Sequence, residues 1–194
     1  MKFQLKNIIA ILVIAFAFAS CSNTEDTNTV NELDGITKFK EIVNATHTIE
    51  LYAHMGYLEQ GFNEISLRIK DNATGEYVKN ASVSWLPLMH MTMMTHSCPK
   101  SEVEKVTTAG TVYEGNIVFQ MAQNATEYWD LKIDYTINGT DYTATSVIDV
   151  PASTKQRVTT FTGSDDVKYI LAYVEPHHPK VALNDITVAV YKME

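Results

Sequence analysis

The alternation of apolar and polar residues before Asn138-Gly139 is the feature that most constrains the fold. From Trp129 to Ile137, apolar side chains occupy every second position and polar or charged ones mostly fill the positions between. A period of two separates the two faces of a β-strand, and Asn-Gly is a strong hairpin signal because both residues accept a positive φ. Residues 142–150 are therefore predicted to form the return strand.

The same period recurs along most of the chain. Further predicted strands lie at residues 47–53, 62–70, 81–86, 111–121, 167–174 and 185–191. Only residues 31–43 hint at a helix. Many short alternating strands with turn signals between them are typical of two packed sheets. We predict an all-β protein, an immunoglobulin-like β-sandwich.

A nine-residue segment recurs 121 residues later in the chain. Residues 61–69 (Gly-Phe-Asn-Glu-Ile-Ser-Leu-Arg-Ile) match residues 182–190 (Ala-Leu-Asn-Asp-Ile-Thr-Val-Ala-Val), and upstream Ile49 matches Ile170 in the same register. We expect one complete unit over residues 46–151. Residues 155–194 are then an incomplete second repeat, the start of a second, truncated sandwich. Its last strands should be poorly covered edges.

The N-terminal segment has the pattern of a bacterial lipoprotein signal. Lys2 and Lys6 precede an apolar run at residues 8–19, which is shorter than the roughly 20 residues of a transmembrane helix. Residues 18–21, Phe-Ala-Ser-Cys, resemble a lipobox, which implies cleavage before Cys21 and lipid on its sulfur. We expect a signal peptide at residues 1–20 and a lipidated cysteine with a polar tether at residues 21–45. The alternative is a secreted protein with Cys21 as a free thiol.

Charge and leader together restrict the partners. The formal net charge of −8 excludes electrostatic attraction to nucleic acid. We expect no nucleic-acid partner and a contact with the membrane only through lipid on Cys21. The predicted location is the bacterial cell envelope, lipid-anchored, at the outer membrane.

Residues 89–98 hold an unusual density of metal-binding side chains. Thioethers, imidazoles and the only thiol outside the leader occupy seven of these ten positions: Met89, His90, Met91, Met93, Met94, His96 and Cys98. Thioether and thiolate are soft ligands and imidazole is borderline, so the mixture favours copper, Cu(I) above all. A zinc site would show more Cys or His, and a calcium site would show carboxylates.

The geometry of this window depends on its local structure. Pro87 and Pro99 bracket it, so neither a continuous strand nor a long helix should run through it. An extended segment would place four ligands on one face: His90, Met94, His96 and Cys98. A helical turn would stack His90, Met94 and Cys98. We expect His90, His96 and Cys98 to bind the ion, completed by Met91 or Met94. Affinity should fall on acidification as the ligands protonate.

Two sets of residues in and beyond this window resemble a known family. They are Pro87-Leu88-Met89-His90-Met91 with His96-Ser97-Cys98-Pro99, and Pro179-Lys180-Val181-Ala182-Leu183-Asn184-Asp185. They resemble YtkA-like domains, which are related to FixH-like domains, in the version found in lipoproteins of Bacteroidetes-type bacteria. The resemblance runs from about residue 46 to residue 194. It implies an envelope β-sandwich associated with copper handling, a copper-donating or copper-receiving protein partner, and a ligand role for the 89–98 loop.

Other interpretations of the chain remain open. The Met-rich loop could instead dock a protein, as adaptable Met surfaces do, in a structural or adhesive immunoglobulin-like lipoprotein. Cys98 could alternatively exchange disulfides with a partner thiol. Glu175, His177 and His178 form a turn that could bind Cu(II) or simply be solvated; in the repeat register this turn matches residues 54–56.

Enzyme motifs are missing from the sequence. It contains no P-loop, no Gly-x-Ser-x-Gly, no Cys-x-x-Cys and no His-Glu-x-x-His. We therefore expect a protein that is not an enzyme, and a copper-binding envelope lipoprotein that buffers or delivers the metal.

Overall fold

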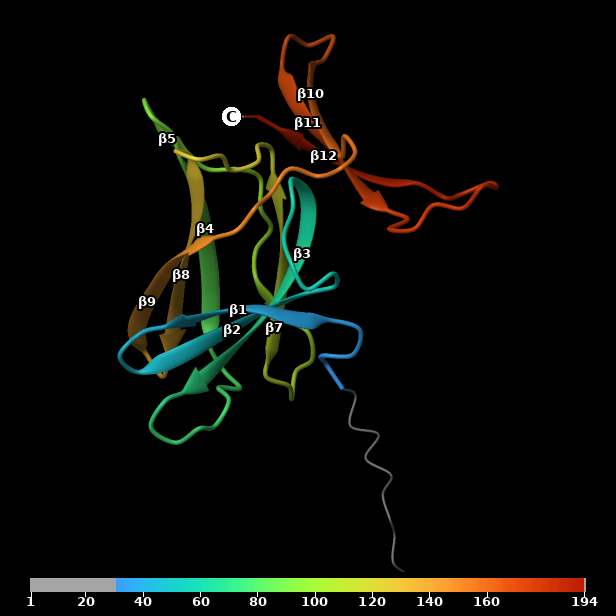
Figure 1. Cartoon of the computed structure of the whole chain (residues 1–194). Helices are drawn as coiled ribbons and strands as arrows, with labels where there is room; N and C mark the ends of the chain where they lie inside the picture. Colours follow the sequence, from blue (N-terminus) through green and yellow to red (C-terminus); the bar gives the residue numbers. More distant parts are fainter. Residues whose placement is uncertain (1–30, 194) are drawn as a thin grey trace, which may run out of the picture. The chain divides into compact units, whose positions relative to one another are not determined.

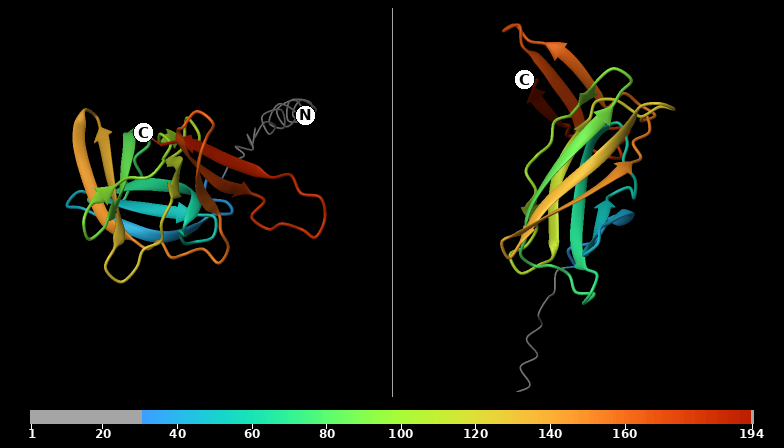
Figure 2. Two further views of the ribbon diagram at one scale, coloured as in Figure 1. Left: turned by 90° about the horizontal axis from the view of Figure 1, so that it is seen from above. Right: turned by 90° about the vertical axis from the view of Figure 1, so that its left-hand side faces the viewer.

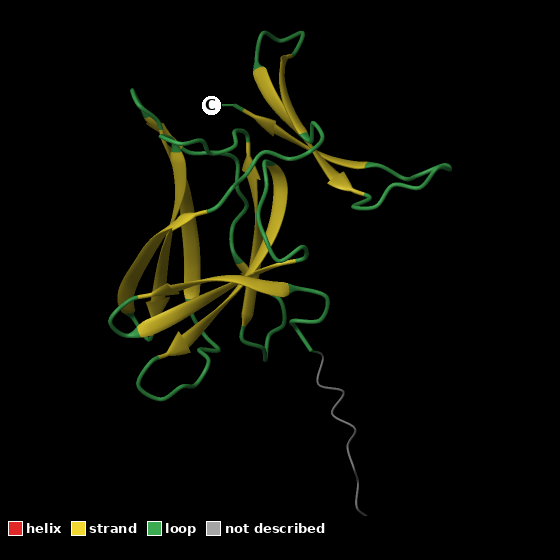
Figure 3. Ribbon diagram, viewed as in Figure 1, coloured by secondary structure: helices red, strands yellow, loops and turns green. Residues whose placement is uncertain are grey.

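The computed structural model describes residues 31–193, and within them every regular element is a β-strand (Figures 1 and 3). Twelve strands form three sheets in which all neighbouring strands are antiparallel. The predicted all-β class is confirmed. In this part of the chain no helix has the length and apolar content needed to cross a membrane. The predicted signal peptide and Cys21 lie outside the described residues.

Two sheets, here called the core sheets, share one hydrophobic core. The five-stranded sheet has the order β1-β2-β3-β7-β6, with β1 at Thr37–Val43, β2 at His47–Ala53, β3 at Gly61–Asp71, β7 at Val112–Phe119 and β6 at Glu104–Lys105. The four-stranded sheet has the order β5-β4-β8-β9, with β5 at Thr95–His96, β4 at Ser82–His90, β8 at Tyr128–Ile137 and β9 at Thr140–Ile148. Figure 2 shows the strands from two further directions.

The core forms because each alternating strand turns its apolar set inward. Leu51, Leu67 and Leu131 are fully buried and come from both core sheets. Trp129 is also fully buried, packs against Phe119 at 5.0 Å between ring centroids, and donates its indole N–H to the Met121 carbonyl at 2.9 Å. A buried tryptophan needs such a partner for its N–H.

The predicted β8–β9 hairpin is confirmed. Asn138 and Gly139 both have a positive φ, 51° and 81°, as a two-residue turn of this kind requires. The hint of a helix over residues 31–43 is wrong, because Thr37–Val43 forms strand β1, inside the segment expected to be a polar tether. Pairing with β2 satisfies its backbone and buries Ile42 in the core.

The third sheet is formed by the C-terminal residues. It has the order β10-β11-β12, with β10 at Val158–Thr162, β11 at Lys168–Glu175 and β12 at Thr187–Lys192. Together with the core sheets it belongs to one compact unit, described from residue 32 to residue 193. Ile170 and Ala172 form a small buried cluster with Val118 of β7. Val188 and Val190 of β12 are exposed, as expected for a poorly covered strand.

Candidate metal centre

The metal-binding window folds as a hairpin formed by β4 and β5. Met89 pairs with His96 and His90 with Thr95, and the Met91 N–H donates to the Met94 carbonyl at 2.9 Å. As predicted, no continuous strand or helix spans the window. Strand β4 nevertheless includes Pro87. On the β5 side, β5 pairs only with the last two residues of β4, so Pro87 lies at an edge of the sheet, where a missing N–H is tolerated.

The hairpin divides the predicted ligands between its two faces. Residues directly opposite each other in an antiparallel pair share a face, and the faces alternate along each strand. Met89 and His96 therefore share the inner face, where the His96 ring meets Trp129 edge-on at 5.8 Å. Met91 and Met94, the next pair toward the tip, continue this face.

His90 lies on the opposite face of the hairpin. Its Nε2 is 2.6 Å from Asp130 Oδ2, and its ring stacks on Tyr128 with centroids 4.9 Å apart. The turn at residues 91–94 reverses the chain, so His90 does not share a face with Met94 and His96 as it would in one extended segment. The structure thus separates His90 from the other predicted ligands.

Two predicted ligands belong to the core. Met89 is fully buried and Cys98 is 8% exposed, both within the cluster shared by the core sheets. Burial raises the pKa of the Cys98 thiol strongly, against a small opposing effect of Lys100. Cys98 is a free cysteine. At neutral pH it is a thiol, so a metal that binds there has to displace a proton.

The tip of the hairpin is exposed to solvent. Met93 is 90% and Met94 61% exposed, while Met91 is half-buried against the core. His96 Nδ1 lies 2.9 Å from the Ser97 carbonyl oxygen. Since a carbonyl only accepts, Nδ1 carries the proton and Nε2 keeps its lone pair for another partner. The structure therefore brings Met91, Met94 and His96 together on one accessible face.

Without thioethers, the described residues assemble no metal site. Among residues 31–193, no three His, Cys, Asp or Glu side chains form a group that could hold a metal ion. The expected set of His90, His96 and Cys98 is accordingly not gathered at one point. A metal at the hairpin would depend on thioethers.

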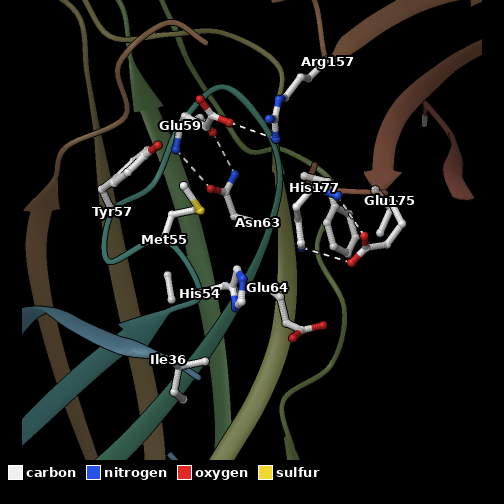
Figure 4. A pocket seen from close by; sticks show the side chains of 13 residues that line it. Ile36, His54, Met55, Tyr57, Glu59, Asn63, Glu64, Arg157, Glu175 and His177 are labelled. Atoms are coloured by element: carbon white, nitrogen blue, oxygen red, sulfur yellow. Dashed lines mark hydrogen bonds and ion pairs between the residues drawn. The ribbon is translucent and has the colours of Figure 1, made fainter. Parts of the chain in front are cut away.

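A second cluster lies in a cavity of about 240 Å³ (Figure 4). Its lining includes His54 and Met55, which follow β2, Glu64 of β3, and Glu175 and His177 from the end of β11 and the turn after it. Sequence reasoning named the 175–178 turn but not its meeting with His54. The repeat register, which aligns residues 54–56 with residues 175–177, was the available signal.

The two imidazoles of this cluster stack on each other. The His54 and His177 rings have centroids 5.2 Å apart and an interplanar angle of 17°. His177 Nε2 lies 3.1 Å from Glu175 Oε1. At the other side of the cavity, Arg157 forms an ion pair with Glu59 at 3.0 Å.

Comparisons with known proteins identify no relative of this chain. No protein-family model, no curated protein and no solved structure matches the chain. Function therefore has to be argued from the residues and their geometry.

Proposed function

We propose that the chain is a lipid-anchored copper-binding protein of the bacterial envelope that holds Cu(I) at the β4–β5 hairpin and buffers or delivers it. In this proposal the core sheets form an immunoglobulin-like β-sandwich of YtkA-like type, tethered through lipid on Cys21. The resemblance of the two proline-containing motifs supports the family assignment. The exposed thioethers of the hairpin support the metal.

The observation that carries the proposal is the exposure of Met93 and Met94 beside Met91 and His96. An apolar side chain gains nothing from a position at the tip of a turn, where it stays in water. Thioethers at that position are accessible to a soft ion such as Cu(I), and His96 adds an imidazole nitrogen. The hairpin holds Met91, Met94 and His96 on one face.

Within this site we assign Met91, Met94 and His96 as the ligands, with Met93 at the entrance. Cys98 and Met89 belong to the buried core, against which Met91 packs. His90 is a control position, because it belongs to the opposite face with Asp130. If Cys98 also binds the ion, its thiol releases a proton.

The test is anaerobic competition for Cu(I) against a chromogenic chelator. The full chain carries Cys21→Ser so that no second thiol competes. We expect one-to-one binding that is lost in Met91→Leu/Met94→Leu/His96→Ala and retained in His90→Ala. Met→Leu conserves volume, so the fold should persist, which circular dichroism checks. Equal binding by the triple variant would overturn the proposal, and Cys98→Ala reports whether the thiol ligates.

The same exposed methionines also favour a second candidate, a docking patch for a protein partner. Met is flexible and polarizable, and it recurs on adaptable binding surfaces. A protein that binds no Cu(I) but loses a partner in Met93→Ser/Met94→Ser would support docking instead.

A further inference from the structure

The cavity beside β2 and β3 combines histidines from the two copies of the repeat. His54 follows the first strand of one copy, and His177 follows the matching strand of the other. Their stacked rings face the same cavity, which Glu64 and Glu175 also line (Figure 4). Two imidazoles and two carboxylates thus converge from segments more than a hundred residues apart in the sequence.

The donor atoms of this cluster are accessible. Neither nitrogen of the His54 ring has a hydrogen-bond partner within residues 31–193. In His177, Nε2 faces Glu175, and this contact orients the ring, as carboxylates commonly orient metal-bound histidines. Nδ1 is then the ring nitrogen left to bind a metal ion. His54 and Glu175 are exposed and His177 is half-buried, so their side chains can turn on a fast timescale.

The electrostatics of the cavity favour a cation. Three glutamates line it, Glu59, Glu64 and Glu175, so carboxylates outnumber guanidinium groups there. An excess of negative charge attracts a positive ion. The one guanidinium lining the cavity, Arg157, is already paired with Glu59.

We propose that His54 and His177, together with Glu64 or Glu175, form a second metal site for a divalent transition-metal ion, bound most tightly as Cu(II). Nitrogen and oxygen donors suit divalent ions, whereas the hairpin offers thioethers, and Cu(II) heads the affinity order for such donors. The rings are stacked, and residues 31–193 hold no ready group of three His, Cys, Asp or Glu ligands, so binding requires these side chains to turn inward. The proposal does not depend on Cu(I) binding at the hairpin.

The test is a titration of the full chain, carrying Cys21→Ser, with Cu(II) and separately with Zn(II), followed by calorimetry. Electron paramagnetic resonance of the Cu(II) form should show coupling to two imidazole nitrogens. His54→Ala and His177→Ala should each weaken binding at least tenfold and remove one nitrogen from the spectrum. The matched control is His178→Ala, an exposed neighbour that does not line the cavity and should bind as the unsubstituted chain does.

The site would be overturned by no binding of either ion, by binding of the double variant His54→Ala/His177→Ala equal to that of the unsubstituted chain, or by a spectrum without nitrogen coupling. Loss of binding in His178→Ala to the same extent would also overturn it, since that would place the ion in the solvated turn. The hairpin triple variant should keep the Cu(II) site, and His54→Ala should keep Cu(I) binding. Failure of one site is thereby distinguished from failure of the other.

Discussion

The hairpins β2–β3 and β11–β12 come from the two copies of the repeat. In both hairpins, an asparagine near the start of the second strand forms the same local structure. Asn63 accepts the Glu59 N–H at 3.1 Å and donates to the Glu59 and Gly61 carbonyls at 2.8 and 2.9 Å. Asn184 makes the same three bonds, at 2.9, 2.9 and 2.7 Å, to the backbone four and two residues before it. The short-range part of the repeat is thus conserved in structure as well as in sequence.

The strands that follow differ in register. In the first copy, Ile49 pairs with Ile69. In the second, Ile170 pairs with Tyr191 instead of Val190, one residue further along, and a bulge lies between Tyr173 and Glu175. A shift by one residue turns every side chain of a strand to the other face. The apolar set of β12 is therefore turned away from the cluster that Ile170 joins.

Burial differs accordingly between the copies. Ile65, Leu67 and Ile69 are fully buried, whereas the matching residues Ile186, Val188 and Val190 are 67%, 45% and 52% exposed. An alternating pattern therefore specifies a strand but not its burial. Burial depends on the register and on whether a second sheet faces the strand.

The largest effect expected from this comparison is on core packing. Leu67→Ala should destabilise the protein by about 2–5 kcal/mol, because it leaves a cavity in a fully buried position. Val188→Ala, at the matching position, should change the free energy of unfolding by less than about 0.5 kcal/mol because the side chain is solvated. Urea unfolding measures both, with an unchanged m-value as the control. A Val188→Ala loss as large as that of Leu67→Ala would mean that another surface covers β12.

The three hydrogen bonds of Asn63 and the matching three of Asn184, here called the asparagine clamps, differ in burial and give a second, smaller expected effect. Asn63→Ala should cost about 1–3 kcal/mol, because Asn63 is buried and its partners would lose their bonds away from water. Asn184→Ala should cost less, about 1 kcal/mol or below, since water can replace the bonds of a more open turn. Thermal unfolding of the two variants gives the difference. Equal losses would show that the clamp acts by local geometry alone, independent of burial.

Much of the fold could be predicted from local pattern. The 47–53 strand matches β2 in its bounds, and the hairpin at Asn138-Gly139 forms where expected. The strand β1 was missed because residues 31–43 lack a clear alternation, and its pairing with β2 is what determines it. The shifted register of β12 likewise depends on non-local pairing, which no local pattern encodes.

The candidate sites were harder to predict from the sequence, because they too depend on non-local strand pairing. The density of Met and His in residues 89–98 marked the window, but the separation of His90 follows from the pairing of Met89 with His96. The meeting of His54 with His177 requires the contact between the two repeats. The candidate ligand types were visible in the sequence, whereas their grouping depends on how the strands pair.

The attachment of the third sheet provides a third test. The Tyr191 hydroxyl donates to Asn116 Oδ1 of β7 at 2.9 Å, beside the small cluster around Val118. Tyr191→Phe should cost about 0.5–1.5 kcal/mol, so amide hydrogen exchange in β11 and β12 should speed up by roughly two- to tenfold. Exchange in β2 and β3 should stay unchanged. Tyr57→Phe is the control, and exchange that speeds up equally in both hairpins would contradict a local attachment.

The smallest effect expected is a pH dependence at a position that carries a carboxyl group in only one copy. Burial alone would raise the pKa of Glu50, but hydroxyl bonds from Tyr52 and Tyr77, together with Lys38, hold it below the usual 4.5. A lowered pKa adds stability that is present above the unfolded pKa and is lost as the pH falls through the folded one. The matching residue of the second copy is Leu171, which has no such contribution.

Unfolding measured from pH 7 down to pH 3 tests this point. Glu50→Gln should lose part of the acid-induced fall in stability, because a neutral amide has no proton to take up, and the two curves should converge at the acid end. Glu76→Gln, at an exposed position, controls for the change in net charge. If Glu50→Gln and the unsubstituted chain lost stability in parallel from pH 5 to pH 3, the hydrogen bonds to Glu50 would not favour its charged form. Glu50 of β2 would then add no more pH dependence to the free energy of unfolding than Leu171, its counterpart in β11.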